Sequence, residues 1–242
     1  MNIKSIVVLT GAGISAESGL KTFRDNGGLW EGHRVEDVAT PEAFARNPRL
    51  VYDFYNMRRR QLLSGTVHPN AAHLALGEFE QQFAGDFLLI TQNVDDLHAR
   101  AGSSRLLHMH GELRKMRCRQ SNRIYVCDGD IDADSICDCC HYPGNLRPHI
   151  VWFGEVPLSM DIIDTAVSRC DLFVAIGTSG AVYPAAGLRQ IADAYGAHTV
   201  ELNMEPSMSG HLFDEYYYGA AGEVVPRYFS NLLASLTTHT GR

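Results

Sequence analysis

IVVLTGAGISAES, residues Ile6–Ser18, combines two signals that point to the fold of this chain. An apolar, β-branched run ends in a glycine-rich turn, and the turn leads into a predicted helix start. Gly11, Gly13 and Ala16 follow the G-x-G-x-x-G/A spacing of dinucleotide-binding turns. Glycines permit a tight turn and let backbone N–H groups approach a pyrophosphate, to which a helix N-terminus adds favourable charge. The same spacing occurs where glycine serves packing alone, so both interpretations remain open.

Length and composition restrict the class of protein. The chain has 242 residues, 45% of them hydrophobic, which suffices for one large domain or one domain with a smaller insertion. A net charge of −7 argues against nucleic acid or an anionic membrane as the main partner. No apolar run reaches the length of a transmembrane helix and the first residues do not form a signal peptide, so we expect a cytoplasmic protein. Its six cysteines are then expected as reduced thiols or metal ligands.

Apolar, β-branched runs recur along the chain and alternate with helix-like segments. This alternation predicts a parallel sheet with crossover helices. Each run ends in small or polar residues, and ligands of open α/β sheets bind beyond the carboxyl ends of the strands. The polar ends therefore either line one crevice or only cap the helices that follow. The predicted strands are Ile6–Leu9, Phe87–Ile90, Leu106–Met109, Leu172–Ile176 and Thr199–Leu202.

Two segments interrupt this alternation of strands and helices: one is predicted to be mostly helical, and the other is rich in Cys, Asp and Gly. We expect both to be insertions that form a smaller lobe beside a Rossmann-like α/β domain, and Val224–Leu236 to form a closing amphipathic helix. The predicted Rossmann-like domain comprises residues 1–30, 74–113 and 150–242. The predicted small lobe comprises a helical module, 31–73, and a cysteine module, 114–149.

Six motifs occur in a fixed order: GAGISAESGLKTFRDNGGLW, TQNVDDLH, HMHGEL, RPHIVWFGE, IGTSGAVYPAA and ELNMEPS. Together they resemble the sirtuin family of NAD-dependent protein deacylases, most closely the bacterial branch that removes acetyl and acidic acyl groups from lysine. The resemblance runs from about Ile6 to Leu233. It implies NAD as co-substrate, acylated lysines of proteins as substrates, and transfer of the acyl group to ADP-ribose with release of nicotinamide.

The resemblance assigns catalytic roles to two strand ends. In sirtuins the acyl-lysine carbonyl oxygen attacks C1′ of the nicotinamide ribose, which requires a fixed geometry and a general base for the ribose hydroxyls. His108 and His110 are two apart on a predicted strand and would face the same side. The family's base corresponds to His110, although the pair could also be core histidines. Asn93 corresponds to the residue that holds the nicotinamide ribose, and Asp95 to the acceptor for the nicotinamide amide. The alternative for TQNVDDL is a helix N-cap.

Further cofactor contacts follow from the same resemblance. The loop TFRDNGGLW would close over the cofactor, with Phe23 shielding the nicotinamide and Arg24 near the phosphates. The strand ends GTS and LNMEP would bind phosphate and ribose oxygens, and the adenine would lie near Ala221. The implied cofactor-binding residues are Gly11, Ala12, Gly13, Ile14, Ser15, Glu17, Phe23, Arg24, Trp30, Gln92, Asn93, Val94, Asp95, Gly177, Thr178, Ser179, Asn203, Met204, Glu205 and Ala221.

The motifs VWFGE and VYP correspond to the family's substrate cleft, where a peptide backbone adds as a strand between the lobes. In the alternative interpretation, Trp152 and Phe153 are only core between the lobes. The implied substrate contacts are Val151, Phe153, Gly154 and Val182.

Tyr55 and Arg58 bear on the choice of acyl group. They stand at i and i+3 of a predicted helix and share a face, and a guanidinium with a phenol can hold a carboxylate. Tyr-x-x-Arg marks the sirtuins that accept succinyl- and malonyl-lysine, and Ala39 falls where that branch has a small residue. The alternative is a solvated basic face formed by Arg58, Arg59 and Arg60.

One structural zinc ion is expected in the cysteine module. Many sirtuins bind zinc through two C-x-x-C pairs, in which four thiolates hold a lobe with little core. Here the first pair reads C-R-Q-S, so Ser121 replaces one ligand, and Cys139 or Cys127 could supply the fourth. The alternative is a degenerate site without metal. The remaining expected ligands are Cys118, Cys137 and Cys140.

Two other functions share the nucleotide motifs. A Rossmann dehydrogenase needs a hydride-accepting substrate site, and no Tyr-x-x-x-Lys pattern stands near a predicted strand end. A non-enzymatic ADP-ribose-binding module would explain GAGIS, GTS and LN, but it would need neither His110 nor TQNVD.

Overall fold

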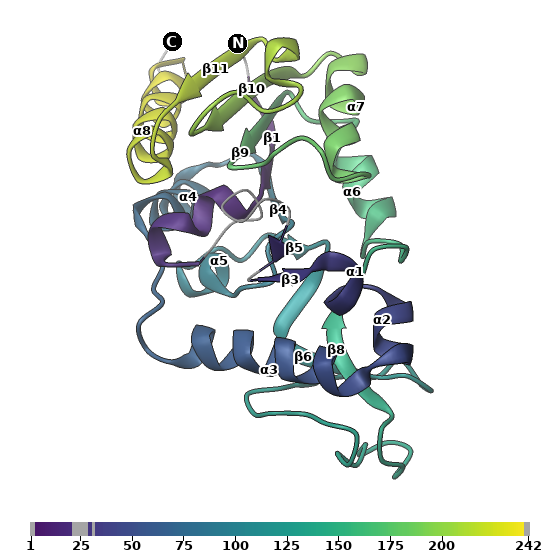
Figure 1. The fold of residues 1–242 in the computed structure, drawn as a ribbon. Coiled ribbons are helices and arrows are strands. Elements are labelled where there is room, and N and C mark those ends of the chain that lie inside the picture. Colours follow the sequence, from purple (N-terminus) through teal and green to yellow (C-terminus); the bar gives the residue numbers. More distant parts are fainter. Residues whose placement is uncertain (1–2, 21–28, 31, 240–242) are drawn as a thin grey trace.

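The larger lobe is built on a six-stranded parallel sheet in the computed structural model, which describes residues 3–20, 29–30 and 32–239 (Figure 1). Its strands are β1 (Ser5–Thr10), β4 (Asp86–Thr91), β5 (Leu106–His108), β9 (Leu172–Ile176), β10 (His198–Asn203) and β11 (Glu215–Tyr218). Their order across the sheet is β11-β10-β9-β1-β4-β5. The chain moves outward from β1 to one side through β4 and β5, and then to the other through β9, β10 and β11. This is the Rossmann order, with its switch point between β1 and β9.

All five predicted strands are present, each within one residue of its predicted ends. The prediction of a Rossmann-like parallel sheet is therefore confirmed. Only β11 was not predicted among the strands of this sheet. Its sequence is EYYY, and its three tyrosines are exposed at the edge of the sheet, so it lacks the buried apolar run that marks the other strands.

Helices cover both faces of the sheet. In β1, Ile6 and Val8 point into the core beneath α4 (Ala71–Gln82) and α8 (Ala221–His239). Val7 and Leu9 point into the core beneath α6 (Met160–Val167) and α7 (Leu188–Ala194). A strand that is buried on both faces is apolar throughout, which explains the run IVVL. The helices are α1 (Val35–Val38), α2 (Pro41–Arg46), α3 (Pro48–Leu63), α4 (Ala71–Gln82), α5 (Leu97–Arg100), α6 (Met160–Val167), α7 (Leu188–Ala194) and α8 (Ala221–His239). The predicted closing helix is α8, which is longer than expected.

The turn after β1 continues as a 3₁₀-helix, η1 (Ala12–Ser18), where the sequence predicted the start of an ordinary helix. The backbone N–H groups of Gly11 and Gly13 donate to carbonyls at the end of β9, at 2.9 Å each. These bonds fix the turn to the neighbouring loop. The short helix then ends at Gly19, whose φ of 86° lies in the left-handed region.

The smaller lobe joins the helices α1, α2 and α3 to a second sheet. This antiparallel sheet has the order β7-β6-β8, with β6 (Gly111–Cys118), β7 (Ile124–Val126) and β8 (Leu146–Ile150). Apolar side chains of α3 share one core with Leu113 of β6 and Ile150 of β8. The helical and cysteine-bearing insertions thus form one lobe, as expected, while the residue boundaries of the two domains stay a prediction. Shorter elements are β2 (Leu29–Trp30), β3 (His33–Arg34), η3 (Ala185–Gly187) and η4 (Gly210–Leu212).

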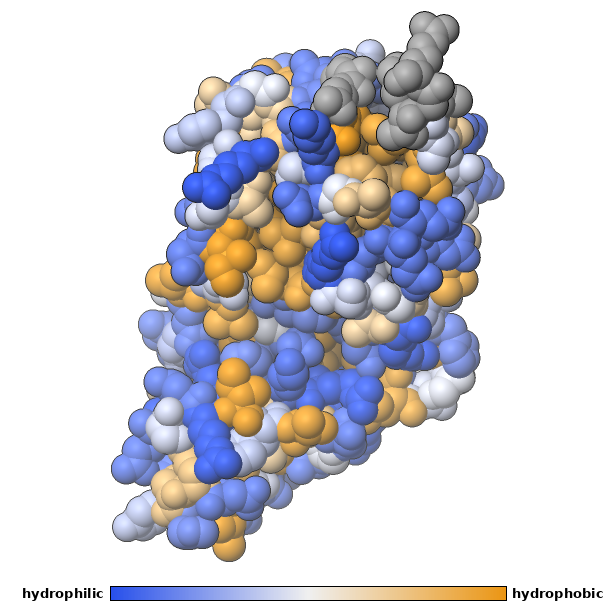
Figure 2. Space-filling view, turned by 180° about the vertical axis from the view of Figure 1, so that it is seen from behind, coloured by the Kyte–Doolittle hydropathy of each residue, from blue (hydrophilic) through white to orange (hydrophobic). Residues whose placement is uncertain are grey.

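The exterior differs between the lobes. Seen from behind, apolar side chains gather over part of the larger lobe, whereas the lower end of the molecule is mostly hydrophilic with isolated apolar residues (Figure 2). Ile136 and Tyr142 of the small lobe are among the exposed apolar side chains. No helix in the described part of the chain combines the length and the apolarity that a membrane crossing requires.

Candidate functional site

The loops after β1 and β9 touch at the switch point of the sheet. A Cβ atom on Gly13 would lie 2.8 Å from the Cα of Gly177, and one on Gly11 would lie 2.8 Å from the Gly177 carbonyl oxygen. Both glycines are therefore required by the packing of the two loops. Packing thus requires these glycines, but this does not decide between packing alone and nucleotide binding. The close approach also brings both loops to the place where Rossmann folds bind nucleotides.

Amide side chains hold several strand ends together at this edge of the sheet. The Nδ2 group of Asn93, after β4, donates to Ser15 Oγ at 3.1 Å. Gln92 Nε2 donates to Thr178 Oγ1 at 3.1 Å, and the Nδ2 group of Asn203, at the end of β10, donates to the Thr178 carbonyl at 2.9 Å. The structure thus gathers polar residues that follow β1, β4, β9 and β10.

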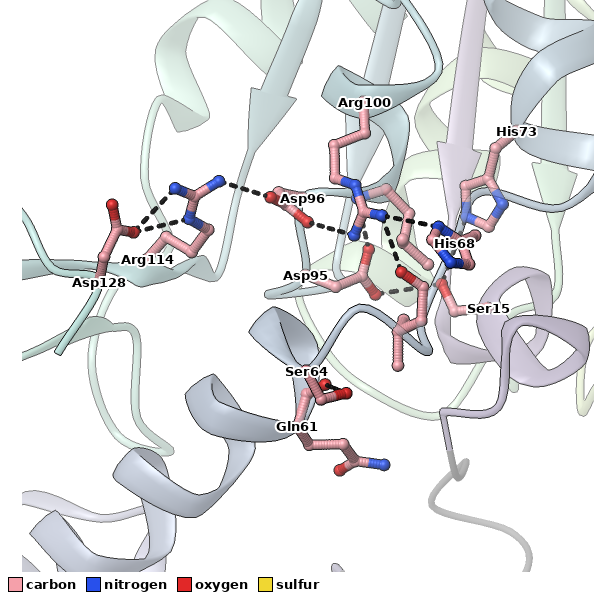
Figure 3. Close-up of polar contacts among 12 residues, drawn as sticks. Ser15, Gln61, Ser64, His68, His73, Asp95, Asp96, Arg100, Arg114 and Asp128 are labelled. Carbon is pink, nitrogen blue, oxygen red and sulfur yellow. Dashed lines mark hydrogen bonds and ion pairs between the residues drawn. The ribbon is translucent and has the colours of Figure 1, made fainter. Parts of the chain in front are cut away.

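Asp95 is a buried carboxylate in this group. Its Oδ2 accepts a hydrogen bond from Ser15 Oγ at 3.1 Å, and its Oδ1 accepts one from the N–H of Leu97 at 3.1 Å (Figure 3). The second bond satisfies the N–H of the first residue of α5, as the capping interpretation expected, although the N-cap position itself is occupied by Asp96. Burial raises the pKa of Asp95 to about 6, because it penalises the charged form.

Asp96, next to Asp95, is engaged in ion pairs. Its carboxylate lies 3.0 Å from Arg114 Nη1 and 3.6 Å from Arg100 Nη1. Arg114 continues the chain of charges to Asp128 at 2.8 Å (Figure 3). Sequence spacing could not predict these ion pairs, because Asp128 and Arg114 come from the cysteine module.

His110 lies in the turn between β5 and β6, so its predicted place on a strand is wrong. The strand ends at His108, and Gly111 then adopts a φ of 83° as the chain reverses into β6. A Cβ on Gly111 would clash with the carbonyl of His149, so the turn requires glycine there. The two histidines therefore do not share a strand face.

The hydrogen bond of His110 fixes which ring nitrogen is basic. Its Nδ1 lies 3.1 Å from the carbonyl oxygen of Gln92. A carbonyl only accepts, so Nδ1 carries the proton and Nε2 is the basic nitrogen. Burial lowers the pKa of His110, an effect that the Gln92 carbonyl opposes. The His110 carbonyl accepts from the N–H of Val151 at 2.9 Å, which places the VWFGE segment beside the histidine.

The segment Val151–Gly154 runs beside Ala39. The N–H of Phe153 donates to the Ala39 carbonyl at 2.9 Å. Trp152 is buried, whereas Phe153 is 47% exposed. The core interpretation is therefore correct for Trp152 and wrong for Phe153. Val182 lies in the loop after β9 and is partly exposed.

Tyr55 and Arg58 lie on α3, as predicted, and both side chains are buried. The Tyr55 oxygen accepts a hydrogen bond from Trp152 Nε1 at 3.0 Å, and burial raises the pKa of Tyr55. The Arg58 guanidinium lies over the Phe54 ring, 4.9 Å from its centre. Because the two residues are three positions apart on one helix and both are buried, the prediction of a shared helix face is confirmed, while their role toward an acyl group stays a prediction.

The interpretation of Arg58, Arg59 and Arg60 as a solvated basic face is wrong for the first two. Arg58 is 8% exposed and Arg59 only 1%. Arg59 Nε donates to the Leu113 carbonyl at 2.7 Å, which ties α3 to β6. Arg60 points outward and forms an ion pair with Asp130 at 3.4 Å.

Four cysteines form a candidate metal centre where β6 and β8 meet. Their sulfur atoms all lie within 4.8 Å of one another. Cys127 is not among them, because its thiol donates to the Gly129 carbonyl at 3.4 Å. Cys139 is thus the fourth candidate ligand, and Ser121 Oγ lies 3.1 Å from its sulfur. Four thiols at this spacing suit tetrahedral Zn²⁺. The cluster consists of Cys118, Cys137, Cys139 and Cys140.

Comparison with known proteins assigns a family. The model of the Sir2 family matches residues 11–184. The chain belongs to the Sir2 family. The NAD-dependent protein deacylase of Pasteurella multocida is 60% identical to this Sir2 chain over 228 residues, which are 94% of this chain and 97% of the relative.

Solved structures of Sir2 proteins have the same fold. A Sir2 homologue in complex with NAD is 39% identical, with a TM-score of 0.87 over 97% of this chain and 91% of that chain. A Sir2 protein with a p53 peptide and NAD⁺ is 28% identical, with a TM-score of 0.78 over 95% of this chain and 93% of that chain.

Several implied contacts of this Sir2 chain lie at the margins of the site or outside the described residues. Glu17 accepts a hydrogen bond from the N–H of Gly222, next to Ala221. Met204 follows β10 and is exposed. Phe23 and Arg24 lie outside the described residues, and the side chain of Trp30 is likewise not described. The individual roles of all these residues stay predictions.

Proposed function

We propose that this chain is an NAD-dependent protein-lysine deacylase that transfers the acyl group to ADP-ribose and releases nicotinamide. The observation that carries the proposal is the meeting of four strand ends at the Rossmann switch point, next to a histidine whose Nε2 is basic. The relatives and solved complexes of the Sir2 family support it.

His110 is proposed as the general base. With Nδ1–H held by the Gln92 carbonyl, Nε2 is the nitrogen that takes a proton from a ribose hydroxyl while the acyl oxygen is bonded to C1′. Asn93 and Asp95 are proposed to orient the nicotinamide ribose and its carboxamide. Asp95 is pre-oriented by Ser15, which limits the reorganisation needed when the co-substrate binds.

The substrate is proposed to be an acylated lysine in a protein segment that binds as an added strand. The segment Val151–Gly154 supports this, because it runs beside both His110 and Ala39 and exposes Phe153. A peptide bound there would present its lysine toward the histidine. Main-chain pairing tolerates many sequences, so we expect low sequence selectivity.

We further propose that the enzyme removes succinyl and malonyl groups as well as acetyl groups. Tyr55 and Arg58 would bind the distal carboxylate through a phenol and a guanidinium. Their burial supports this, since a charged hydrogen bond counts for more away from water. NAD as co-substrate and reduced cysteines suit action in the cytoplasm.

The four thiols of the cysteine cluster are proposed to hold one structural Zn²⁺. When bound, the ion would cross-link strands and loops that have little core of their own. The chemistry of deacylation would be left to residues of the larger lobe.

Incubation with NAD and acylated peptides tests the proposal against its rivals. A deacylase releases nicotinamide only when an acyl peptide is present. A dehydrogenase would form NADH instead, and an ADP-ribose-binding module would form neither product. Either of the last two results would contradict the proposed function.

A further inference from the structure

Glu155 lies at the centre of a partly buried charge cluster with Arg147 and Arg117, next to the acyl-group residues. Its Oε1 accepts from Arg147 Nη1 at 2.6 Å and from Arg117 Nη2 at 3.1 Å. Its Oε2 accepts from Arg147 Nη2 at 3.0 Å and from the N–H of Trp152 at 2.8 Å. Burial, the largest single influence, would raise the pKa of Glu155, but the hydrogen bonds from Arg147 and the Trp152 N–H and the charges of Arg147 and Arg117 together lower it. The carboxylate is thus charged and held from three sides.

The same cluster holds the indole of Trp152. The Arg147 guanidinium lies 3.3 Å from the centre of the Trp152 ring, and only 2% of Trp152 is exposed. Glu155 fixes the backbone of Trp152 while Arg147 fixes its ring. The orientation of the indole N–H is therefore set by this pair.

That N–H points at the proposed acyl site. Trp152 Nε1 donates to the Tyr55 oxygen at 3.0 Å, and an indole can only donate. The Tyr55 ring also packs against the Trp152 ring, with centroids 6.4 Å apart. An unbroken series of contacts leads from Glu155 through Trp152 to the phenol.

The arginines of this charge cluster lie on strands of the small lobe. Arg117 and Arg147 are register partners on β6 and β8, and α3, which carries Tyr55, contacts both strands (Figure 1). Opposed arginines on neighbouring strands repel each other unless an anion bridges them. Glu155 supplies that anion from the segment that follows β8.

We propose that Glu155 is a positioning residue for acyl selectivity: bridged to Arg147 and Arg117, it fixes Trp152 and through it the Tyr55 phenol. This inference rests on the proposed binding of acidic acyl groups by Tyr55 and Arg58. Glu155 itself touches neither the acyl group nor NAD. Loss of the bridge lets the indole rotate, so the phenol loses its orientation toward the distal carboxylate.

The test compares Glu155→Gln and the milder Arg117→Gln with the control Asp130→Asn. The control also exchanges a carboxylate for an amide in the small lobe, but it only breaks the exposed ion pair with Arg60 of α3. For Glu155→Gln we expect kcat/KM on succinyl peptide to fall about fivefold to tenfold, the effect of about one hydrogen bond, mainly through KM. Acetyl peptide should change less than about twofold, and Arg117→Gln should give a smaller loss in the same direction.

A spectroscopic reading separates positioning from general destabilisation. The chain has two tryptophans, so a Trp30→Phe background leaves Trp152 as the sole indole emitter. In that background, Glu155→Gln should shift the Trp152 emission, and Asp130→Asn should not. Equal losses on both peptides, or no shift with unchanged selectivity, would overturn the inference. If the wild-type enzyme has no measurable activity on succinyl peptide, the proposed acyl preference itself is refuted.

Discussion

At the scale of the single residue, His110 carries the catalytic proposal. We expect His110→Ala to lower kcat on acyl peptide by about 10²–10⁴-fold, the usual effect of losing a positioned base. NAD binding should persist, because the loops after β1 and β9 are fixed by their own hydrogen bonds. Product release measured by chromatography and NAD affinity measured by calorimetry provide the two readings. Normal turnover in a folded variant would refute the assignment.

The environment of His110 also sets a pH dependence. Burial lowers the pKa of His110 from its ordinary value of 6.5, so the imidazole stays neutral and basic somewhat below that pH. The acid limb of kcat/KM, which reports the free enzyme, should therefore fall at a pH below 6.5. Steady-state rates between pH 5 and pH 8 measure it. An acid limb with its midpoint above pH 7 would contradict this expectation, because it would require a raised pKa of His110.

Ionised Asp95 should lower the free energy of unfolding, because its carboxylate is buried. Burial raises its pKa from 3.8 to about 6, so its contribution to stability is full below pH 3.8 and is lost as pH rises through about 6. At pH 8 this corresponds to about 3 kcal/mol of destabilisation. Asp95→Asn removes the charge, so it should raise the Tm at pH 8 by about 6–12 °C and by less at pH 5. Calorimetric unfolding at the two pH values measures both shifts, and deacylation should be impaired. A lower Tm at pH 8 would contradict this account.

At the scale of the element, α3 shows what periodicity can and cannot predict. The spacing of Tyr55 and Arg58 correctly placed them on one side of a helix. It did not identify Arg59 as the most buried arginine of the described residues, because two of its three acceptors, the carbonyls of Leu113 and Gly129, come from distant segments. Helix spacing defines neighbours on the helix, whereas burial depends on what packs against it.

The acyl preference is tested on this helix. A charge-assisted hydrogen bond in a buried setting contributes about 1.5–3 kcal/mol, or about 10–150-fold. Arg58→Met should lose most kcat/KM on succinyl peptide, mainly through KM, because acetyl-lysine has no carboxylate to bind. Arg60→Met is the matched control, since Arg60 points to solvent from the same helix. Equal effects on the two peptides would contradict carboxylate binding by Arg58.

At the scale of the whole molecule, the sequence was sufficient to predict the larger lobe and insufficient for the details of its site. The apolar runs of β1, β4, β5, β9 and β10 are signals that need no tertiary information. His110 was wrongly placed on a strand because β5 ends at His108. The chain then reverses through Gly111, which packs against the His149 carbonyl. Glu155 was missed for a different reason. Its partners Arg147 and Arg117 are brought together only by strand pairing.

Metal binding at the cysteine cluster should contribute to the stability of the whole molecule. Metal binding adds directly to folding free energy where the surrounding core is small, as it is around Cys118, Cys137 and Leu146. We expect purified protein to contain one zinc ion per chain, measured by elemental analysis. Cys139→Ser should reduce zinc retention and lower the Tm by on the order of 5–10 °C. Cys127→Ser should leave zinc retention unchanged, because the Cys127 thiol points to the Gly129 carbonyl and away from the cluster. Full zinc retention in Cys139→Ser, or loss of zinc in Cys127→Ser, would mean that Cys127 or another group completes the site.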